Sequence, residues 1–290
     1  MPTDYAAELR EALAAAKVAG DYVSREYAGF TPIPNAAATI STHVDHGAQE
    51  IILRHLREKF PTYGVVAEEK TPAAENPPTG DEHTWVVDPI DGTRGFAMKN
   101  GEFSVMIGLT RGDRVVLGVV VEPVADRVTY AVEGQGCYAR TGDGDPVRCR
   151  VTATTDLAEA VLTQSHSKRW APPKAVVTAL KPARLAEMYS AGVKLALVAR
   201  GEADLYVNDY LNFHDWDICA GEILVSEAGG RVTLFDGGPV TYGGKGAVQR
   251  RGMVATNGVL HAETLARLRR SRMPPFGVNS TPRHGPRGSR

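Results

Sequence analysis

Residues 85–93 read Trp-Val-Val-Asp-Pro-Ile-Asp-Gly-Thr, an apolar strand that runs into two carboxylates and then a Gly-Thr pair. The proline between Asp88 and Asp91 fixes its own φ and stiffens the turn, so both acids can be aimed at one point. Gly92 has no Cβ and lets the backbone come close to a ligand, and Thr93 adds a hydroxyl and a backbone N–H. This layout favours a hard cation held by oxygen ligands, with the N–H groups receiving a phosphate oxygen. An Asp-Pro turn with ordinary surface acids is the alternative.

Two further segments place carboxylates where polar groups gather around a cleft. Residues 65–69 form an apolar strand that ends in Glu68 and Glu69, and residues 216–221 open an apolar helix with Asp217 in its first turn. Strand ends and helix starts commonly line binding clefts. Two carboxylates ~4 Å apart repel by about 4 kcal/mol at an effective dielectric constant of 20. If the segments converge, divalent cations are therefore required to hold the acids together.

The pattern around these segments predicts an α+β chain. Up to residue 132 we expect helices over 4–18 and 45–60, then strands over 64–67, 84–88, 103–110, 115–122 and 127–132. Gly, Asp and Pro turns between the strands indicate a mostly antiparallel meander. Farther along we expect strands over 160–163, 203–207 and 231–234 and helices over 173–180, 192–200, 216–228 and 258–270. A strand-rich part followed by a mixed part favours layered lobes over a doubly wound repeat.

Length and composition describe an ordinary globular protein. The chain has 290 residues, of which 43% are hydrophobic and 23% charged, and this excludes a disordered or fibrous protein. A polar stretch near residues 150–158 predicts a boundary between two lobes. The N-terminal lobe, 1–150, would carry most of the metal ligands, and the C-terminal lobe, 151–270, would carry Asp217 and the substrate-selecting residues. Residues 271–290 are rich in Pro, Gly, Ser and Arg and predict a flexible tail.

Charge and cysteine content limit the partners and the compartment. The 33 basic and 34 acidic residues give a net charge of −1, which predicts binding neither to nucleic acid nor to a membrane surface. Three cysteines without a C-x-x-C pair argue against a disulfide framework or a structural zinc site. No apolar run approaches the ~18 residues of a membrane span. Charged residues also interrupt any signal-peptide core at the N-terminus, so we expect a cytoplasmic protein.

Two motifs together resemble a known family. The segment Asp88-Pro-Ile-Asp-Gly-Thr93, followed later by Trp216-Asp217 and Val225-Ser-Glu-Ala-Gly-Gly230, is similar to the inositol monophosphatase superfamily of magnesium-dependent, lithium-sensitive phosphomonoesterases. The motifs stand in the expected order, and the likeness covers roughly residues 5 to 265. The resemblance implies a layered αβαβα sandwich of the inositol monophosphatase/fructose-1,6-bisphosphatase type, and it implies a homodimer.

The resemblance also assigns roles to single residues. It implies two or three Mg²⁺ ions, and the ligands it implies are Glu68, Asp88, the carbonyl of Ile90, Asp91 and Asp217. Glu69 would lie next to these ligands and support them without binding the metal itself. Asp45 and Thr93 would orient and activate the attacking water, because Thr42-His-Val-Asp45 resembles the family's Thr-x-x-Asp motif. The backbone N–H groups of Gly92 and Thr93 would hold nonbridging phosphate oxygens.

The sequence departs from the family pattern at three places. Ala37 stands where the family usually has an aspartate, Ile40-Ser41 stands where it has Pro-Val, and Ala67 replaces the common glycine before the glutamate pair. None of these changes removes a ligand named above. We expect the loop near the third metal to be altered.

Within the superfamily the chain looks most like the 3'(2'),5'-bisphosphate nucleotidases. Asn100-Gly-Glu-Phe-Ser-Val105 follows the metal loop as their Asn-Gly-Glu-Phe-Thr-Val does, and His166 and Lys194 lie in stretches similar to theirs. A lysine near the site suits a second phosphate. Tyr210 stands where inositol enzymes usually have a glutamate, and an aromatic ring suits a nucleotide base. The alternatives are a loop histidine, a solvated helix lysine and a tyrosine buried in ordinary packing.

The sequence thus predicts a Mg²⁺-dependent phosphomonoesterase that removes the 3'-phosphate of 3'-phosphoadenosine 5'-phosphate through metal-activated water. Inositol 1-phosphate, another sugar phosphate or histidinol phosphate is the alternative substrate. A non-catalytic cation-binding module is a third possibility, although the acids lack EF-hand spacing.

Overall fold

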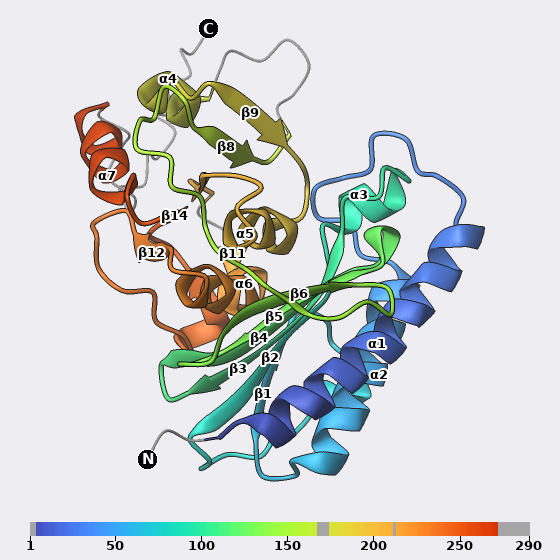
Figure 1. Cartoon of the computed structure of the whole chain (residues 1–290). Coiled ribbons are helices and arrows are strands. Elements are labelled where there is room, and N and C mark those ends of the chain that lie inside the picture. The colour runs from blue at the N-terminus through green and yellow to red at the C-terminus, as the bar shows by residue number, and fades with distance from the viewer. Residues whose placement is uncertain (1–3, 167–173, 211–212, 272–290) are drawn as a thin grey trace, which may run out of the picture.

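The computed structural model describes residues 4–166, 174–210 and 213–271 and stacks five layers of helix and sheet (Figure 1). Two helices cover the outer face of a seven-stranded sheet, two more fill the space between this sheet and a five-stranded one, and two cover the far face. In chain order the pairs are α1 (Ala6–Gly29) with α2 (His43–Lys59), α5 (Ala191–Ala199) with α6 (Asp215–Glu227), and α4 (Ala175–Leu180) with α7 (His261–Arg270). The predicted αβαβα sandwich is confirmed.

The first sheet is a meander with one parallel edge. Its order follows the chain: β1 (Gly64–Ala67), β2 (His83–Asp91), β3 (Ser104–Arg111), β4 (Arg114–Glu122), β5 (Arg127–Val132), β6 (Gly136–Thr141) and β7 (Val147–Arg148). All neighbours pair antiparallel except β1 and β2, which run parallel with Ala67 opposite Val87. Parallel strands end at the same sheet edge. This register therefore brings Glu68 beside Asp88, the next residue of each strand.

The second sheet has the order β12-β14-β10-β8-β9. Its strands are β8 (Val161–Gln164), β9 (Arg184–Glu187), β10 (Leu205–Asn208), β12 (Arg231–Leu234) and β14 (Met253–Thr256). A two-stranded ribbon, β11 (Phe213–His214) with β13 (Val248–Gln249), lies apart from both sheets in the pairing. Three 3₁₀ turns occupy Pro72–Ala74, Pro123–Ala125 and Lys245–Ala247. The sequence did not indicate β6, β7, β9, β11, β13 or β14.

Helix α1 is longer than the predicted helix over residues 4–18. Beyond Val18 its small residues continue the buried face, and Ala19, Gly20 and Val23 are buried. This face packs on α2 and on β4. Small side chains let the helix lie close to its neighbours, so burial carries it to Gly29 although few large apolar residues mark the extension.

Two glycines let α6 lie directly on the first sheet. Gly108 on β3 and Gly118 on β4 are opposite each other in the register. A Cβ on Gly118 would lie 2.2 Å from the carbonyl oxygen of Ala220, and one on Gly108 would lie 2.6 Å from Cys219 Sγ. Contacts this short cannot form, so only glycine permits the approach. The start of α6, with Asp217, is thereby fixed near the end of β2.

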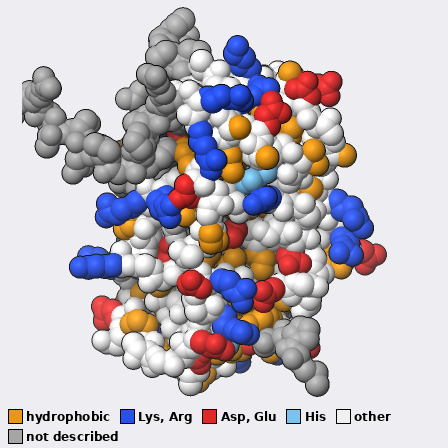
Figure 2. All heavy atoms as spheres, turned by 90° about the vertical axis from the view of Figure 1, so that its left-hand side faces the viewer, with side chains coloured by type: hydrophobic (Ala, Val, Ile, Leu, Met, Phe, Trp, Pro, Cys, Tyr) orange, Lys and Arg blue, Asp and Glu red, His pale blue; other side chains and the backbone are white. Residues whose placement is uncertain are grey.

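The surface carries charges of both signs, and the two sheets use successive stretches of the chain. Figure 2 shows basic and acidic side chains intermixed over the face it presents. Among the described residues, no helix is both long enough and apolar enough to cross a membrane. The first sheet spans residues 64–148 and the second 161–256, with α6 in contact with both. The two-lobe division stays a prediction, and the predicted tail lies outside the described residues except for Ser271.

Candidate active site

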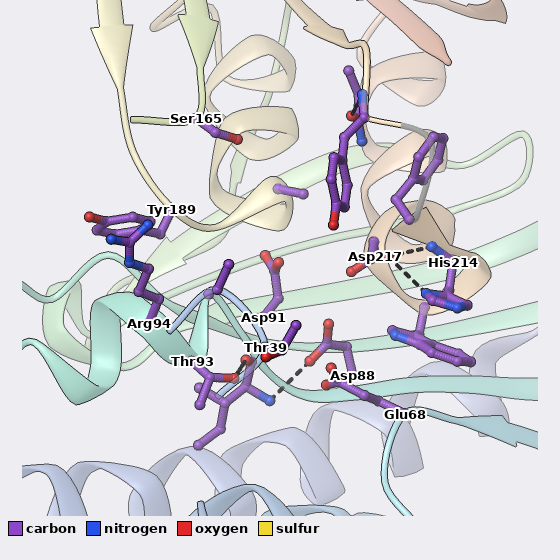
Figure 3. A pocket seen from close by; sticks show the side chains of 18 of the residues that line it. Thr39, Glu68, Asp88, Asp91, Thr93, Arg94, Ser165, Tyr189, His214 and Asp217 are labelled. Atoms are coloured by element: carbon purple, nitrogen blue, oxygen red, sulfur yellow. Dashed lines mark hydrogen bonds and ion pairs between the residues drawn. The ribbon is translucent and has the colours of Figure 1, made fainter. Parts of the chain in front are cut away.

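The predicted carboxylates meet in one pocket of about 520 Å³. Asp88 and Asp91 come from the end of β2 and Asp217 from the first turn of α6, and one oxygen from each lies within 4.8 Å of the other two. Glu68, which follows β1, lines the same pocket. Figure 3 shows the four side chains converging on a common space. We call Glu68, Asp88, Asp91 and Asp217 the acidic wall.

A bulge and local hydrogen bonds hold the two acids at the end of β2. The pairing of β2 with β3 shifts register between Asp88, which pairs with Met106, and Asp91, which pairs with Ser104, so one extra residue of β2 bulges between the two acids. The N–H of Ile90 donates to Asp88 Oδ1 at 3.1 Å. Gly92 has φ +87°, and a Cβ there would lie 2.7 Å from the carbonyl oxygen of Glu102. Both the conformation and the lack of space explain the glycine.

Thr93 begins the short helix α3 (Thr93–Ala97) and contacts the start of α2. Its Oγ1 lies 2.8 Å from Asp45 Oδ1 and 2.9 Å from the carbonyl oxygen of Ile90. Asp45 also accepts hydrogen bonds from the N–H of Thr42 at 2.9 Å and from its hydroxyl at 2.6 Å, as part of a capping box. The structure thus joins Asp45 and Thr93, which lie far apart in sequence.

Burial and crowding raise the pKa values of the acidic wall. Burial raises the pKa of Asp217 to about 7, with the charge of Asp91 adding to the effect. Asp88 is fully enclosed, and burial followed by repulsion from Glu68 raises its pKa well above the usual range. Glu68 stands at the open side of the pocket, where desolvation between the walls and then repulsion from Asp217 raise its pKa to about 8. The site thus resists ionisation unless positive charge enters.

This donor set fits divalent magnesium. Its ligand atoms are carboxylate oxygens with the Ile90 carbonyl nearby, and hard cations such as Mg²⁺ prefer oxygen donors. No histidine or cysteine joins the cluster among the described residues. A cation would offset the repulsion that the raised pKa values report. The residues present therefore match the cation that the sequence implies.

Residues that the sequence did not indicate hold Asp91 in place. The N–H of Gly192 donates to Asp91 Oδ2 at 2.7 Å, and the hydroxyls of Ser190 and Ser104 donate to the same oxygen. Ser190 is the N-cap of α5. Its position before the apolar run of α5 is a capping signal that could have indicated it.

Glu69 does not line the pocket. Its carboxylate accepts from Ser41 Oγ at 2.6 Å and lies 3.2 Å from His46 Nε2, and its N–H donates to Gln49 Oε1 at 2.8 Å. Ser41, one of the departures from the family pattern, therefore ties the loop before α2 to the end of β1. Glu69 follows the predicted ligand Glu68 in sequence but is not among the residues that line the cavity.

Lys194 on α5 and Tyr210, which follows β10, also line the pocket. Lys194 is 1% exposed, so the alternative of a solvated helix lysine is wrong. Its ammonium donates to Ser165 Oγ at 3.0 Å and to the carbonyls of Met188 and Tyr189 at 3.1 and 3.2 Å. Burial lowers its pKa to about 8. Tyr210 is 59% exposed, so the alternative of a tyrosine buried in ordinary packing is wrong too.

His166 lies at the pocket edge beside Tyr189. Its Nε2 is 2.6 Å from Glu102 Oε2, and its ring centre is 4.5 Å from that of Tyr189. The guanidinium of Arg94 lies over the ring of Tyr189, with its carbon atom 5.2 Å from the ring centre. We call Arg94, His166, Tyr189 and Tyr210 the aromatic rim. Ser167 and Lys168, which follow His166 in the stretch likened to the nucleotidases, lie outside the described residues.

Comparison with known proteins identifies the family. Residues 5–273 match the model of the Inositol monophosphatase family. The chain belongs to the inositol monophosphatase family. An inositol-1-monophosphatase of Caulobacter vibrioides is 30% identical over 265 residues, which cover 88% of this chain and 98% of the relative. With the family's acidic cluster in place, the chain is a metal-dependent phosphoric monoester hydrolase.

Other relatives carry several names. A histidinol-phosphatase of Mycobacterium tuberculosis is 31% identical over 230 residues, covering 78% of this chain and 84% of that protein. Among solved structures, an inositol monophosphatase from Anabaena superposes with a TM-score of 0.73 at 27% identity, covering 94% of this chain and 98% of the other. The suhB protein of Bartonella henselae gives 0.75 at 26% identity, with 91% and 98% coverage. Family membership favours catalysis over a purely structural cation-binding module.

Proposed function

We propose that this chain hydrolyses the monophosphate ester of a small polyol or sugar, with inositol 1-phosphate as the first substrate to test. The observation that carries the proposal is the convergence of Asp88, Asp91 and Asp217 from two separate elements. The relatives named as inositol monophosphatases support a polyol ester. In this proposal Glu68 and the carbonyl of Ile90 complete the ligands of two or three Mg²⁺ ions.

The chain's own residues supply positioning and proton transfer. When bound, magnesium provides Lewis-acid stabilisation of phosphate charge. The Thr93 hydroxyl donates its hydrogen bond to the Asp45 carboxylate, so a lone pair of Oγ1 is left to accept a hydrogen bond from water. Burial raises the pKa of Asp45, which makes it a stronger base than a surface aspartate. We assign the N–H groups of Gly92 and Thr93 to the nonbridging oxygens of the phosphate. Glu69 supports the loop before α2 through Ser41.

The test is phosphate release from inositol 1-phosphate and from a panel of sugar phosphates and histidinol phosphate. We expect turnover with Mg²⁺ and none after the cation is removed with EDTA. Release that continues unchanged in EDTA, or no release from any ester in Mg²⁺, would contradict the proposal.

A second candidate substrate is 3'-phosphoadenosine 5'-phosphate. Tyr210 favours it, because an exposed aromatic face on the pocket can stack on a nucleotide base. Lys194 gives it less support than its position in sequence suggests, because all three ammonium protons already have acceptors. The comparison is kcat/KM on this nucleotide against kcat/KM on inositol 1-phosphate. A tenfold advantage for the nucleotide would make it the leading substrate.

Three further expectations stay predictions: the homodimer, inhibition by Li⁺ and the cytoplasmic location. The first two follow from the resemblance and the third from the sequence alone. Sedimentation at enzyme concentrations used in assays addresses the first. An activity series in LiCl with a matched NaCl series addresses the second.

A further inference from the structure

Arg94 enters the pocket from the residue directly after Thr93. It lies in α3 (Thr93–Ala97), is half-buried and lines the same cavity as the acidic wall. Figure 3 shows Arg94 beside Tyr189 on one side of the site, with His214 on the other side. The pocket therefore has a cationic group close to, but separate from, its carboxylates.

The charge of Arg94 is uncompensated within the described chain. A guanidinium carries five N–H donors. None of those of Arg94 makes a hydrogen bond or an ion pair with a described residue, and its Nε is shielded from water without a partner. Arg200, which is also half-buried, is the contrast: its Nη1 lies 2.6 Å from Glu122 and its Nε 2.7 Å from Glu202. A partly desolvated cation without a counter-ion is costly, so Arg94 is set to receive an anion.

Tyr189, on whose ring Arg94 stacks, is held in place by other contacts. The N–H of Tyr189 donates to Glu102 Oε2 at 3.1 Å, and its hydroxyl contacts Met98 Sδ at 3.7 Å. His166 occupies the same Glu102 oxygen at 2.6 Å. Glu102, the nearby carboxylate, is thus engaged by Tyr189 and His166. A guanidinium stacked on a held ring loses little freedom when it binds a ligand.

We propose that Arg94 binds a second oxyanion of the substrate, so that the preferred ester carries a phosphate or carboxylate besides the phosphate that is removed. The inference rests on the proposed function, because the acidic wall must take the reacting phosphate. Guanidinium recognises phosphate and carboxylate through two parallel N–H···O bonds, a geometry that an ammonium cannot reproduce. Lys194, with its donors already used, leaves this role to Arg94. Arg94 is therefore a specificity-determining residue.

The test compares pairs of esters that differ by one anionic group. The phosphate arm is 3'-phosphoadenosine 5'-phosphate against 3'-AMP, and the carboxylate arm is 3-phosphoglycerate against glycerol 3-phosphate. Each is assayed with the wild-type chain, Arg94→Gln, Arg94→Lys and the control Arg10→Gln, whose side chain is 70% exposed. Melting temperatures accompany all four proteins, and if Arg94→Gln does not fold, Arg94→Lys carries the test.

We expect the wild type to prefer, in at least one pair, the ester that carries the additional anionic group. The pair that shows this preference identifies whether Arg94 binds a phosphate or a carboxylate. Arg94→Gln should reduce this preference at least tenfold through KM, and Arg94→Lys should restore only part of it. In both Arg94 variants, turnover of 3'-AMP and glycerol 3-phosphate, which lack the additional anionic group, should change less than twofold. An equal loss on both members of each pair, or a wild type without preference in either arm, would overturn the inference. The failure of the proposed function looks different, because no ester would then be hydrolysed at all.

Discussion

The acidic wall and the aromatic rim face one pocket but are built differently. The acids of the wall stand at the ends of β1 and β2 and at the start of α6, and Asp88 and Asp91 are buried. The rim comes from α3 and from connecting segments, and Tyr210 is 59% exposed. Elements fixed by the core hold charged groups in a set geometry, whereas loops vary at low cost. We therefore propose that the wall carries the reaction and that the rim selects the substrate.

Breaking the wall should have the largest effect. Asp91→Asn removes a charged ligand but leaves an oxygen that can still accept the N–H of Gly192, so the fold should persist. Loss of a residue that only hydrogen-bonds to a metal ligand already lowers metal affinity or activity ~10–100-fold. For Asp91 itself we therefore expect kcat/KM to fall by more than ~100-fold. The control is Asp21→Asn, an exposed carboxylate paired with Lys17. Activity of Asp91→Asn near the wild-type level in saturating Mg²⁺ would remove Asp91 from the cation site.

The charge of the wall should also make stability depend on pH and on cations. Burial raises the pKa of Asp217 from 3.8 to about 7, so without cations the folded chain binds a proton between these pH values that the unfolded chain does not. Stability should therefore fall as pH rises from ~4 to ~7. Mg²⁺ at ~100 times its dissociation constant should add about 2.7 kcal/mol. Thermal melts in EDTA and in Mg²⁺ from pH 5 to pH 8 test this: a Mg²⁺ effect that does not grow with pH would contradict it.

The wall depends on the close contact of α6 with the first sheet. Gly118→Ala places a Cβ 2.2 Å from the Ala220 carbonyl oxygen, so α6 must shift and carry Asp217 with it. Overpacking of this kind costs ~1–3 kcal/mol, which urea unfolding would measure, and activity should fall as well. Gly29→Ala is the control, because an added Cβ meets nothing there. Unchanged stability and activity in Gly118→Ala would show that the glycine contact does not position the wall.

Changes in the rim should be smaller and should depend on the substrate. Tyr210→Ala should raise KM for a nucleotide ester by about tenfold, because stacking of a base on an aromatic ring contributes ~1–3 kcal/mol. kcat on that ester and both constants on inositol 1-phosphate should stay within twofold. Tyr210→Phe, which keeps the ring, should behave like the wild type. Equal losses on both substrates would mean that Tyr210 supports the pocket and does not select its ligand.

The sequence predicts the wall better than the rim for a physical reason. Asp88 and Asp91 end an apolar strand and Asp217 opens an apolar helix, so the acids coincide with element ends that the sequence marks. Arg94, in the short helix α3, and Tyr189, in a connecting segment, are single residues, and their pairing exists only after the chain folds. In the fold, β14 was missed for a related reason. Its four residues, Met253–Thr256, are all buried, so no alternation marks them as a strand.

Family motifs identify some residues that act across elements, but not all of them. Thr42 and Asp45 were indicated by a motif, and the structure adds why the motif works: the capping box holds Asp45 against Thr93. Ser190 and Gly192, which donate to Asp91, were not indicated, because their role depends on α5 packing beside the end of β2. Residues that act on a ligand from another element need the tertiary structure before they can be assigned.

The most direct test of the account is a crystal of the protein soaked in Mn²⁺ and measured for anomalous scattering. We expect peaks within ligand distance, ~2.0–2.6 Å, of the carboxylate oxygens of Asp88, Asp91 and Asp217. Asp91→Asn should lose at least one of them. Wild-type crystals with no peak in the pocket, or with Mn²⁺ bound only elsewhere, would contradict the claim that these carboxylates are assembled to hold divalent cations.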